Sequence, residues 1–496
     1  MKTCETINRR EFLATTGATA LGAMLSAGAG RTLGADAGRQ PSFAVRECYC
    51  PAHFGNAYEA MWPLEMEAYL AEMKWWGFNR YGDWITTTDV CNPYTTDAFW
   101  ALAAEQLGRK KKAFQVAQKS GLALNLIVTP NHVYLDQLRP HYAAKKGSRI
   151  QGQLICPSHP EARKLILENF ERWFRDFAES GIRLSAFTAF AYDYGGCDCE
   201  KCRPWIITFA RLMKEIHAIG LKYHPDIEPW FCSWWWVPEE HQLINEWAVK
   251  EAPGWLKAMT LHIEYGQTGF KDVAVPDGCR KLAFVHIGYS DESAANDIYA
   301  KWGPVVATRR MTKTLAGIAA QGADGFQAYS EGIFDDVNKA LLAGLGSGRF
   351  RDAQDVLQGY ACRYFNVSGE QASLWARWMS AWGDRRTPKL PEAQKEFDVM
   401  AAPVTSTWRL EHWRSKLILE SLDRQIGKPK PDAWTPEKMK LVEEFWAQQE
   451  HLQRDIYRLG PVRHVFTPKF RPPDWYDSWQ KAVKSATKQQ TLPDQT

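Results

Sequence analysis

The sequence lacks a long uninterrupted apolar segment beyond its N-terminal region, and it lacks an excess of charge of either sign. No later stretch approaches the ~18 consecutive apolar residues that a membrane-spanning helix requires. Lysine and arginine number 61 against 57 aspartate and glutamate, so the formal net charge is only +4. We therefore expect no membrane span in the mature chain. We also expect no nucleic-acid partner, which would require basic residues gathered on one face.

Two further features are missing from the sequence. No glycine-rich phosphate-binding turn follows the first strand-like run at residues 43–50, which disfavours an open dinucleotide-binding sheet. No internal repeat is present, and no segment marks an interface between subunits.

Aromatic residues, in contrast, are abundant. The chain has 23 Trp, and aromatic residues make up 13% of it. A flat aromatic ring suits the apolar C–H face of a pyranose, so aromatic residues gathered on a surface indicate sugar binding. The alternative for any single Trp is a place in a large core.

The N-terminus resembles a targeting signal. Arg9 and Arg10 precede a mildly apolar run of small residues at 14–29, an arrangement similar to a twin-arginine export signal. We expect residues 1–37 to be removed by cleavage after Ala37, although cleavage after Ala29 also fits. The mature protein would then be periplasmic or secreted. A chance arginine pair before an anchoring helix is the alternative.

Apolar strand-like runs alternate eight times with amphipathic stretches, the pattern of a parallel sheet covered by helices. We predict strands at residues 43–50, 78–84, 122–130, 184–192, 227–234, 258–265, 282–289 and 325–329. We predict helices at residues 64–76, 97–119, 160–180, 205–223, 302–321 and 335–345. Eight units in roughly 300 residues fit a (β/α)₈ TIM barrel, the α/β fold class that we predict for residues 38–348. An open doubly wound sheet is the alternative.

Beyond residue 348 the pattern becomes helical throughout. Residues 353–382, 390–426 and 436–459 have Trp, Tyr and Leu at helical spacing, which predicts three long helices. We therefore predict an α-helical C-terminal domain over residues 349–483. The tail at residues 484–496 is rich in Gln, Thr and Pro and is predicted to be disordered.

Carboxylates follow several of the predicted strands, at the end of a TIM barrel where catalytic groups gather. Asp193, Glu264 and Glu331 follow the fourth, sixth and eighth strands. Hydrolysis of a glycosidic bond needs one protonated carboxyl group for the leaving oxygen and one ionised carboxylate that attacks the sugar or activates water. We predict that Asp193 and Glu331 are the catalytic pair, with Glu264 as a third candidate. The alternative for each is a carboxylate that orients sugar hydroxyls or forms a salt bridge.

Aromatic, histidine and further polar residues occupy the same strand ends. We predict that ten of them bind the substrate: Asp83, Trp84, His132, Tyr192, Tyr194, Trp234, Tyr265, His286, Tyr289 and Tyr329. If the substrate is a uronic acid, Arg46, Arg80 or His132 would hold its carboxylate. Asp335 and Asp336 are predicted to cap the helix that follows them.

These residues support three functional hypotheses. The first is an exported glycoside hydrolase that acts on an oligosaccharide or polysaccharide and needs no cofactor for catalysis. The second is a metal-dependent sugar isomerase or epimerase, because His132, Glu264, His286 and Glu331 are side chains that can bind a divalent metal. The third is a barrel that binds carbohydrate without catalysis.

The chain has 11 Cys, one of which, Cys4, lies in the expected leader. Cys197, Cys199 and Cys202 form a C-x-C-x-x-C loop after the fourth strand. This spacing can place three thiolates around one structural zinc ion.

The fourth zinc ligand would be Cys156, Cys232 or a histidine. A disulfide within the loop or from the loop to Cys156 is the alternative, because an oxidising compartment permits disulfides. Cys48 and Cys50 are two residues apart on a predicted strand and should share one face of it.

Three segments together resemble a known group of proteins. They are Cys-Pro-Ser-His-Pro-Glu-Ala-Arg at 156–163, Tyr-Asp-Tyr-Gly-Gly-Cys-Asp-Cys-Glu-Lys-Cys at 192–202, and Tyr-Ser-Glu-Gly-Ile-Phe-Asp-Asp at 329–336. Over residues 43–365 the chain is similar to bacterial exported glycoside-hydrolase-like barrel proteins with a C-x-C-x-x-C loop, near the α-glucuronidase and β-N-acetylhexosaminidase barrels. The resemblance implies a hydrolase of complex glycans. The acidic pair that hexosaminidase-type barrels have after strand four is missing, since Tyr194 follows Asp193, so chemistry assisted by an N-acetyl group is not implied.

Overall fold

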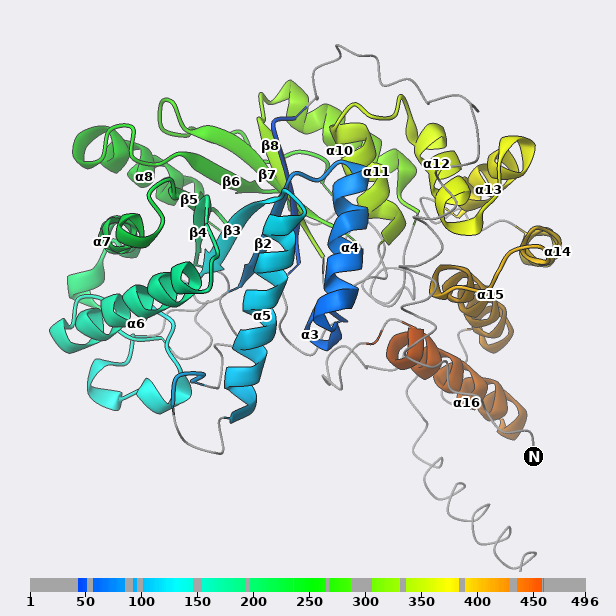
Figure 1. The fold of residues 1–496 in the computed structure, drawn as a ribbon, viewed down its shortest axis with the longest axis horizontal. Helices are drawn as coiled ribbons and strands as arrows, with labels where there is room; N and C mark the ends of the chain where they lie inside the picture. The colour runs from blue at the N-terminus through cyan, green and yellow to red at the C-terminus, as the bar shows by residue number, and fades with distance from the viewer. Residues whose placement is uncertain are drawn as a thin grey trace, which may run out of the picture.

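Eight parallel strands form a closed barrel in which each strand pairs with its neighbours in sequence and β8 pairs with β1 (Figure 1). The TIM-barrel fold class predicted from the sequence is confirmed. None of the helices described has both the length and the hydropathy that a membrane span requires. The computed structural model describes residues 43–50, 57–84, 92–95, 101–145, 154–191, 196–234, 236–264, 267–287, 306–330, 336–382, 389–427, 435–456 and 458. The predicted leader and tail lie outside these residues.

The strands are five to seven residues long and lie close to the predicted runs. Their bounds are β1 Val45–Tyr49, β2 Arg80–Trp84, β3 Ala123–Val128, β4 Ala186–Phe190, β5 Glu228–Cys232, β6 Ala258–His262, β7 Arg280–His286 and β8 Gly325–Tyr329.

Helices cover the outside of the barrel (Figure 1). They are α3 Ala57–Ala60, α4 Pro63–Trp76, α5 Ala101–Lys119, α6 Pro160–Glu179, α7 Trp205–Tyr223, α8 Pro238–Glu251, α10 Thr308–Ala320 and α11 Asp336–Gly346. The structure adds α3 and α8 to the helices that the sequence pattern predicts. The connection from β6 to β7 has no helix in its described part, residues 263–264 and 267–279.

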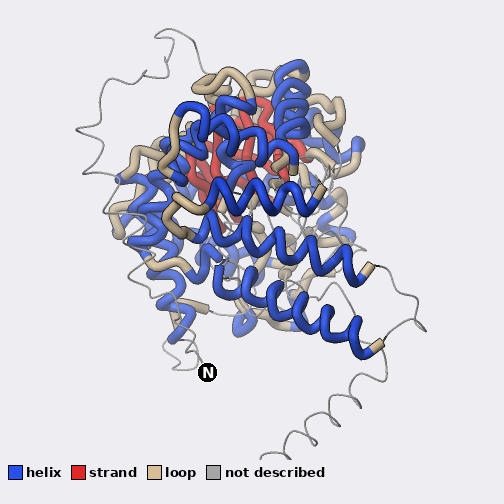
Figure 2. Tube along the Cα trace, turned by 90° about the vertical axis from the view of Figure 1, so that its right-hand side faces the viewer, coloured by secondary structure: helices blue, strands red, loops and turns tan. Residues whose placement is uncertain are grey.

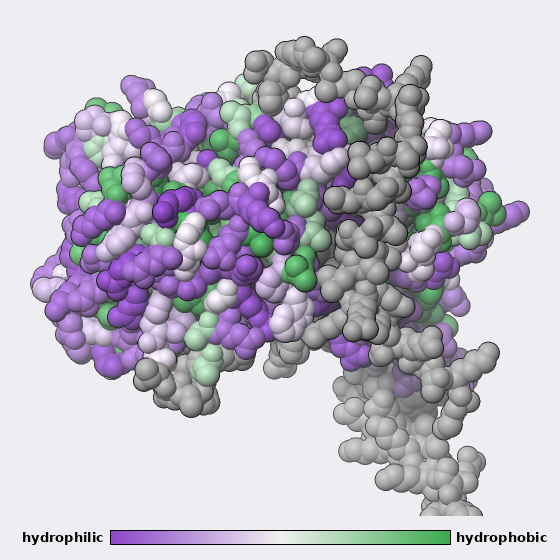
Figure 3. Space-filling view, in the orientation of Figure 1, coloured by the Kyte–Doolittle hydropathy of each residue, from purple (hydrophilic) through white to green (hydrophobic). Residues whose placement is uncertain are grey.

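Helix α6 shows why these segments fold as barrel helices. It has proline at its first position, where the missing N–H costs nothing. Ile166, Phe170, Phe174 and Phe177 follow at helical spacing and are buried, so one face of the helix is apolar. The opposite faces of such helices are polar, and Figure 3 shows a largely hydrophilic surface over α5 and α6.

Inward-facing side chains fill the barrel in three layers, as strand alternation requires. The layer at the N-terminal ends of the strands is apolar and contains Val45, Ala186, Trp230, Ala258 and Leu282. The middle layer is polar. In it, Glu47 of β1 accepts hydrogen bonds from Asn125 Nδ2 at 2.8 Å and from Gln327 Nε2 at 2.9 Å. The third layer, at the C-terminal ends, is aromatic and belongs to the candidate site.

Glu47 is fully buried at the centre of the barrel. Burial raises the pKa of its carboxyl group to about 7, although the positive charge of Arg80 and the hydrogen bonds from Asn125 and Gln327 oppose this shift. Gly82 of β2 faces the Glu47 carboxylate, and a Cβ atom at this position would collide with it. A glycine in this strand interior therefore makes room for the buried acid.

Among the described residues, five further α-helices and a short π-helix at His451–Ile456 follow the barrel and form a helical region beside it, which faces the viewer in Figure 2. The α-helices are α12 Ala353–Phe365, α13 Gly369–Ala381, α14 Leu390–Ala401, α15 Trp408–Ile426 and α16 Pro436–Glu450. A helical C-terminal region was predicted, but two of its three long helices were wrong, because each is divided in two.

The two breaks have local causes. Helix α12 ends at Asn366, which adopts a left-handed conformation with φ 53°. Helix α14 ends just before Pro403, which has no N–H to continue a helix. Helix α15 then begins after Thr407, whose side chain accepts a hydrogen bond from Leu410 N.

A buried ion pair joins the barrel to these helices. Asp336, the first residue of α11, accepts hydrogen bonds from Arg409 Nε of α15 at 2.7 Å and from Tyr360 of α12 at 2.8 Å. Asp336 is 1% exposed and Arg409 is 6% exposed. Asp336 was predicted to cap α11, and its carboxylate instead accepts hydrogen bonds from side chains of the helical region.

Replacing Asp336 with alanine should reduce the free energy of unfolding by roughly 3 to 5 kcal/mol, because Arg409 would stay buried without its charge partner. Urea unfolding followed by circular dichroism measures the loss. The double variant Asp336→Ala/Arg409→Met removes both charges and should recover most of it. A loss below about 1 kcal/mol in the single variant would show that this pair does not stabilise the junction.

The raised pKa of Glu47 predicts a pH dependence of stability. A carboxyl group whose pKa is higher in the folded chain stabilises the fold where it is protonated. Its contribution is complete below the unfolded value of 4.5 and is lost as the pH rises through about 7. The loss is about 3 kcal/mol between those limits. Denaturant unfolding at pH 5 and pH 8 should show most of this decrease in the native chain and a smaller one in Glu47→Gln. Equal decreases in both would contradict the assignment.

Candidate functional site

The C-terminal ends of the strands hold a layer of aromatic and histidine side chains, here called the aromatic floor. Its buried apolar members are Tyr49, Trp84, Ile127, Phe190, Cys232, Trp234, Phe284 and Tyr329. Every strand except β6 contributes one of them, and β6 ends in His262, whose ring contacts Trp234. The floor lies directly above the polar layer because these residues continue the same inward alternation.

Ring contacts connect the aromatic floor from β5 to β1. The Trp234 ring centre lies 4.3 Å from that of His262 and 4.8 Å from that of His286. The His286 ring is 5.4 Å from Tyr329, which is 5.3 Å from Tyr49. The floor is therefore a continuous packed surface beneath the mouth of the barrel.

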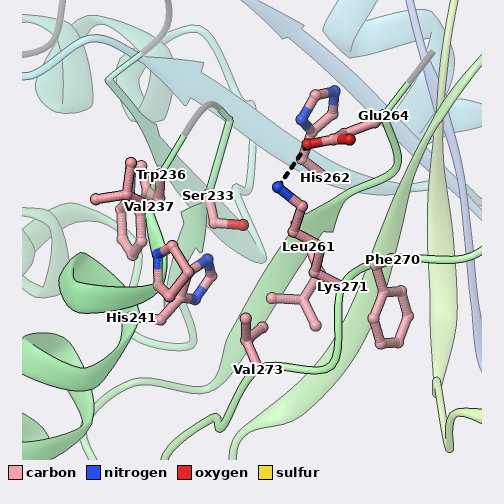
Figure 4. Close-up of a pocket in the computed structure, with 11 residues that line it drawn as sticks. Ser233, Trp236, Val237, His241, Leu261, His262, Glu264, Phe270, Lys271 and Val273 are labelled. Atoms are coloured by element: carbon pink, nitrogen blue, oxygen red, sulfur yellow. Dashed lines mark ion pairs between the residues drawn. The ribbon is translucent and has the colours of Figure 1, made fainter.

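A cavity of about 450 Å³ opens beside the floor, at the C-terminal ends of β5 and β6. Figure 4 shows Trp236, Val237 and His241 on one side of it and Phe270, Lys271 and Val273 on the other. His262 borders both the cavity and the floor. The volume is in the range of small-molecule sites, and the lining is mainly apolar with a few polar groups, as is usual for them.

Glu264 is the carboxylate of this cavity. Its Oε1 lies 2.7 Å from Lys271 Nζ, and its side chain is 52% exposed (Figure 4). The hydrogen bond from Lys271 and the positive charge of that residue hold the pKa of Glu264 below its ordinary value. Glu264 is therefore ionised at neutral pH, which suits a base or a hydrogen-bond acceptor better than a proton donor.

Two histidines beside the aromatic floor have lowered pKa values. Burial lowers the pKa of His262 to about 4, and it lowers the pKa of His286 well below the ordinary value. Both rings are therefore neutral at neutral pH. A neutral imidazole has one donor and one acceptor nitrogen, the pair of functions that hydroxyl groups complement.

The structure brings four of the predicted substrate-binding residues together in the floor: Trp84, Trp234, His286 and Tyr329. It places Asp83 elsewhere. Asp83 is fully buried on the outer face of β2, where its Oδ1 lies 3.2 Å from Lys110 Nζ of α5 and its Oδ2 accepts a bond from Tyr81. Adjacent residues on a strand point to opposite faces, so Asp83 points away from the mouth when Trp84 points into it.

His132 lies in the connection after β3. It is buried and forms an antiparallel bridge with Leu154. Among the residues that the structure describes, the only group of three or more side chains positioned to share a metal ion consists of cysteines. His132, Glu264 and His286 do not form such a group with one another.

The two arginines expected to hold a substrate carboxylate are not at the mouth, and this expectation was wrong. Arg80 begins β2 at the opposite end of the barrel, where it donates to Ser185 Oγ at 2.7 Å and lies over the Trp230 ring. Arg46 is on the outer face of β1 and donates to Gly77 O at 2.6 Å. Parallel strands all end at the same side of the barrel, so a residue at a strand start cannot reach the site.

Several predicted site residues lie outside the described part of the chain. They are Asp193, Glu331, Tyr192, Tyr194, Tyr265 and Tyr289. In sequence, Asp193 comes three residues after the end of β4, and Glu331 comes two residues after the end of β8.

The C-x-C-x-x-C loop is part of a cluster of four cysteines. The sulfur atoms of Cys156, Cys197, Cys199 and Cys202 all lie within 4.8 Å of one another, so the cluster could hold a metal ion. Cys232, considered as a further ligand, is part of the aromatic floor instead.

Cys48 and Cys50 share the outer face of β1, as the strand period predicts, with their sulfur atoms 3.2 Å apart. Tyr49 between them points into the barrel and belongs to the floor.

Several residues of the site were not predicted from the sequence. Tyr49 and Phe284 belong to the floor, and strand alternation could have placed both of them there. Trp236, His241 and Lys271 line the cavity from the loop after β5, from α8 and from the β6–β7 connection, respectively. No periodic signal in the sequence marks this second set.

Comparisons with known proteins give a remote likeness in structure. No protein-family model and no curated protein matches the chain. The GH20 catalytic modules of the pneumococcal exo-β-D-N-acetylglucosaminidase StrH match with TM-score 0.39 at 10% identity, and a structure of the pneumococcal virulence factor StrH matches with TM-score 0.39 at 11% identity. These matches cover 73% of this chain and 99% and 97% of the other chains. A β-N-acetylhexosaminidase matches with TM-score 0.37 and 11% identity, covering 66% of this chain and 78% of its own. Values this low assign no family to the chain.

Replacing Lys271 with methionine removes the hydrogen bond and the charge that lower the pKa of Glu264, so this pKa should rise. A ¹³C NMR titration of protein labelled at its glutamate carboxyl carbons measures the change, with Glu264→Gln identifying the signal. Lys257→Met is the matched control, since Lys257 donates to Gly254 O away from the cavity. A Glu264 pKa that is the same in Lys271→Met and in the native chain would contradict the role of Lys271.

Proposed function

We propose that the protein is an exported glycoside hydrolase acting on an oligosaccharide or polysaccharide. The observation that supports this most directly is the aromatic floor at the C-terminal end of the barrel, with a cavity and an ionised carboxylate beside it. In TIM barrels this end holds the active site. Aromatic rings can pack on the apolar faces of a sugar, and the cavity with its carboxylate can bind the hydroxyl groups of the sugar.

The cavity offers complementary partners to a sugar. Trp236 and Phe270 provide aromatic surface in its wall, while Ser233, His241 and His262 provide hydrogen-bonding groups. His241, like His262, has a pKa lowered to about 4 by burial and is neutral at neutral pH. Neutral imidazole rings form hydrogen bonds with hydroxyl groups but no ion pair with a carboxylate. These histidines therefore favour an uncharged sugar over a uronic acid.

Three carboxylates are assigned to the reaction. Asp193 and Glu331 follow β4 and β8 in sequence, and we assign them as the acid and the nucleophile or base of glycoside hydrolysis, in either order. Glu264, whose pKa is lowered, acts as an ionised partner that orients the substrate or activates water. The reaction needs no cofactor in this scheme.

Export is the second part of the proposal. The arginine pair at residues 9 and 10 and the small-residue run that follows it support a twin-arginine leader, with cleavage after Ala37 and a periplasmic or secreted product.

Digestion of a glycan panel by the purified mature protein tests the proposed activity. Release of sugar from at least one panel member is expected, and NMR of the first product gives its anomeric configuration. A folded protein that releases sugar from no member but binds one of them would contradict hydrolysis and would favour a binding barrel. Activity that is lost with a chelator and changes the sugar without cleaving a glycosidic bond would favour the isomerase alternative.

Asp193→Asn and Glu331→Gln should each reduce kcat by about 10²- to 10⁴-fold, the usual contribution of a positioned acid or base. Binding of the substrate, measured by calorimetry, should persist in both variants. Asp226→Asn is the control, because Asp226 is exposed just before β5, at the opposite end of the barrel. If kcat in both variants equals that of Asp226→Asn, the assignment of these carboxylates is wrong.

A further inference from the structure

Four cysteines from two separate segments converge on one point beside the barrel mouth. Cys156 comes from the connection between β3 and α6, and Cys197, Cys199 and Cys202 come from the loop after β4. We propose that they form a structural zinc site with four thiolate ligands. This inference goes beyond the proposed hydrolase activity, which does not depend on it.

The distances between the sulfur atoms fit one tetrahedral ion. Zn–S bonds of about 2.3 Å place tetrahedral ligands about 3.8 Å apart. The Cys156 sulfur lies 3.7 Å from that of Cys199 and 3.6 Å from that of Cys202, and all four atoms lie within 4.8 Å of one another.

A disulfide arrangement explains this geometry less well. A disulfide bond selects one partner for each cysteine, with its sulfur about 2.0 Å away. Cys156 instead lies almost equally far from two cysteines, so the cluster shows no pairing. Ligands around a single ion are expected to be arranged in this way.

The surroundings provide what a zinc–thiolate site requires. The backbone N–H of Lys145 points at Cys197 Sγ from 3.3 Å, and the Ser158 hydroxyl lies 3.1 Å from Cys202 Sγ. Both can donate hydrogen bonds to thiolates, which fixes the ligands and stabilises their charge. Ala144 and Leu154 pack against the cluster and shield it with apolar surface.

The site would fasten one rim segment of the barrel to another. A hydrogen bond from Asp198 N to Lys145 O joins the same two segments beside the cluster, and one from Ala144 N to Leu154 O closes the connection that contains Cys156. A metal bound here would connect the segment after β3 to the loop at residues 196–202. In sequence, this loop directly follows residues 192–195, which include Asp193. Its role would be to hold the rim in place, because four protein ligands leave no open position for a substrate.

Metal analysis of the full chain, purified without added metal, tests the proposal. We expect about one zinc per chain, and four thiols that react with a maleimide only after the zinc is removed. Intact-mass measurement of the denatured chain should show all cysteines reduced. A zinc-free chain, a chain with iron in this position, or a mass lower by a pair of hydrogens for each disulfide would overturn the proposal.

Variants separate metal binding from a general loss of folding. Cys202→Ser should lose the zinc, whereas Cys156→His should retain it, because histidine replaces a thiolate in many structural zinc sites. Cys362→Ser is the control, since Cys362 is an exposed thiol on α12 and should leave the zinc content unchanged. If Cys202→Ser does not fold, the metal and thiol measurements on the native chain still decide the question. Equal zinc content in Cys202→Ser and in the native chain would contradict the proposal.

Discussion

Glu47 and its hydrogen bonds to Asn125 and Gln327 occupy the centre of the barrel, and the layers above and below are arranged around them. A carboxyl group that is completely buried must have polar partners, and the interior supplies these partners from β3 and β8. The contact also requires that β2 has no side chain at Gly82. With the middle layer fixed in this way, the next inward residues of each strand form the aromatic floor at the mouth. The position of the candidate site thus follows from the packing inside the barrel.

The mouth combines neutral and ionised groups in a way that suits a neutral, hydroxyl-rich ligand. Burial keeps His262 and His286 uncharged, while Lys271 keeps Glu264 ionised at the exposed edge of the cavity. A hydrolase also needs an acid that is protonated at the working pH, and Glu264 does not meet this requirement. The proposed reaction therefore assigns the proton donor to Asp193 or Glu331.

The sequence predicted the barrel well because strand alternation and helical spacing are local signals. The same alternation places Trp84, Trp234, His286 and Tyr329 in the floor, and applied strictly it would have placed Asp83 outside. Glu47 is different, since its hydrogen-bond partners lie 78 and 280 residues away and no local pattern identifies them. The pairing of Glu264 with Lys271 depends on the course of an irregular connection, and the break of the C-terminal helices at Asn366 depends on one left-handed residue.

Sugar binding in the cavity beside the floor is the central claim of the proposed function. A crystal structure of the Asp193→Asn variant with an oligosaccharide substrate measures this directly. We predict a sugar ring in the cavity bordered by Trp236 and His262, with its scissile bond at the mouth of the barrel near the Glu264 carboxylate. An oligosaccharide bound elsewhere on the molecule, with this cavity empty, would contradict the account.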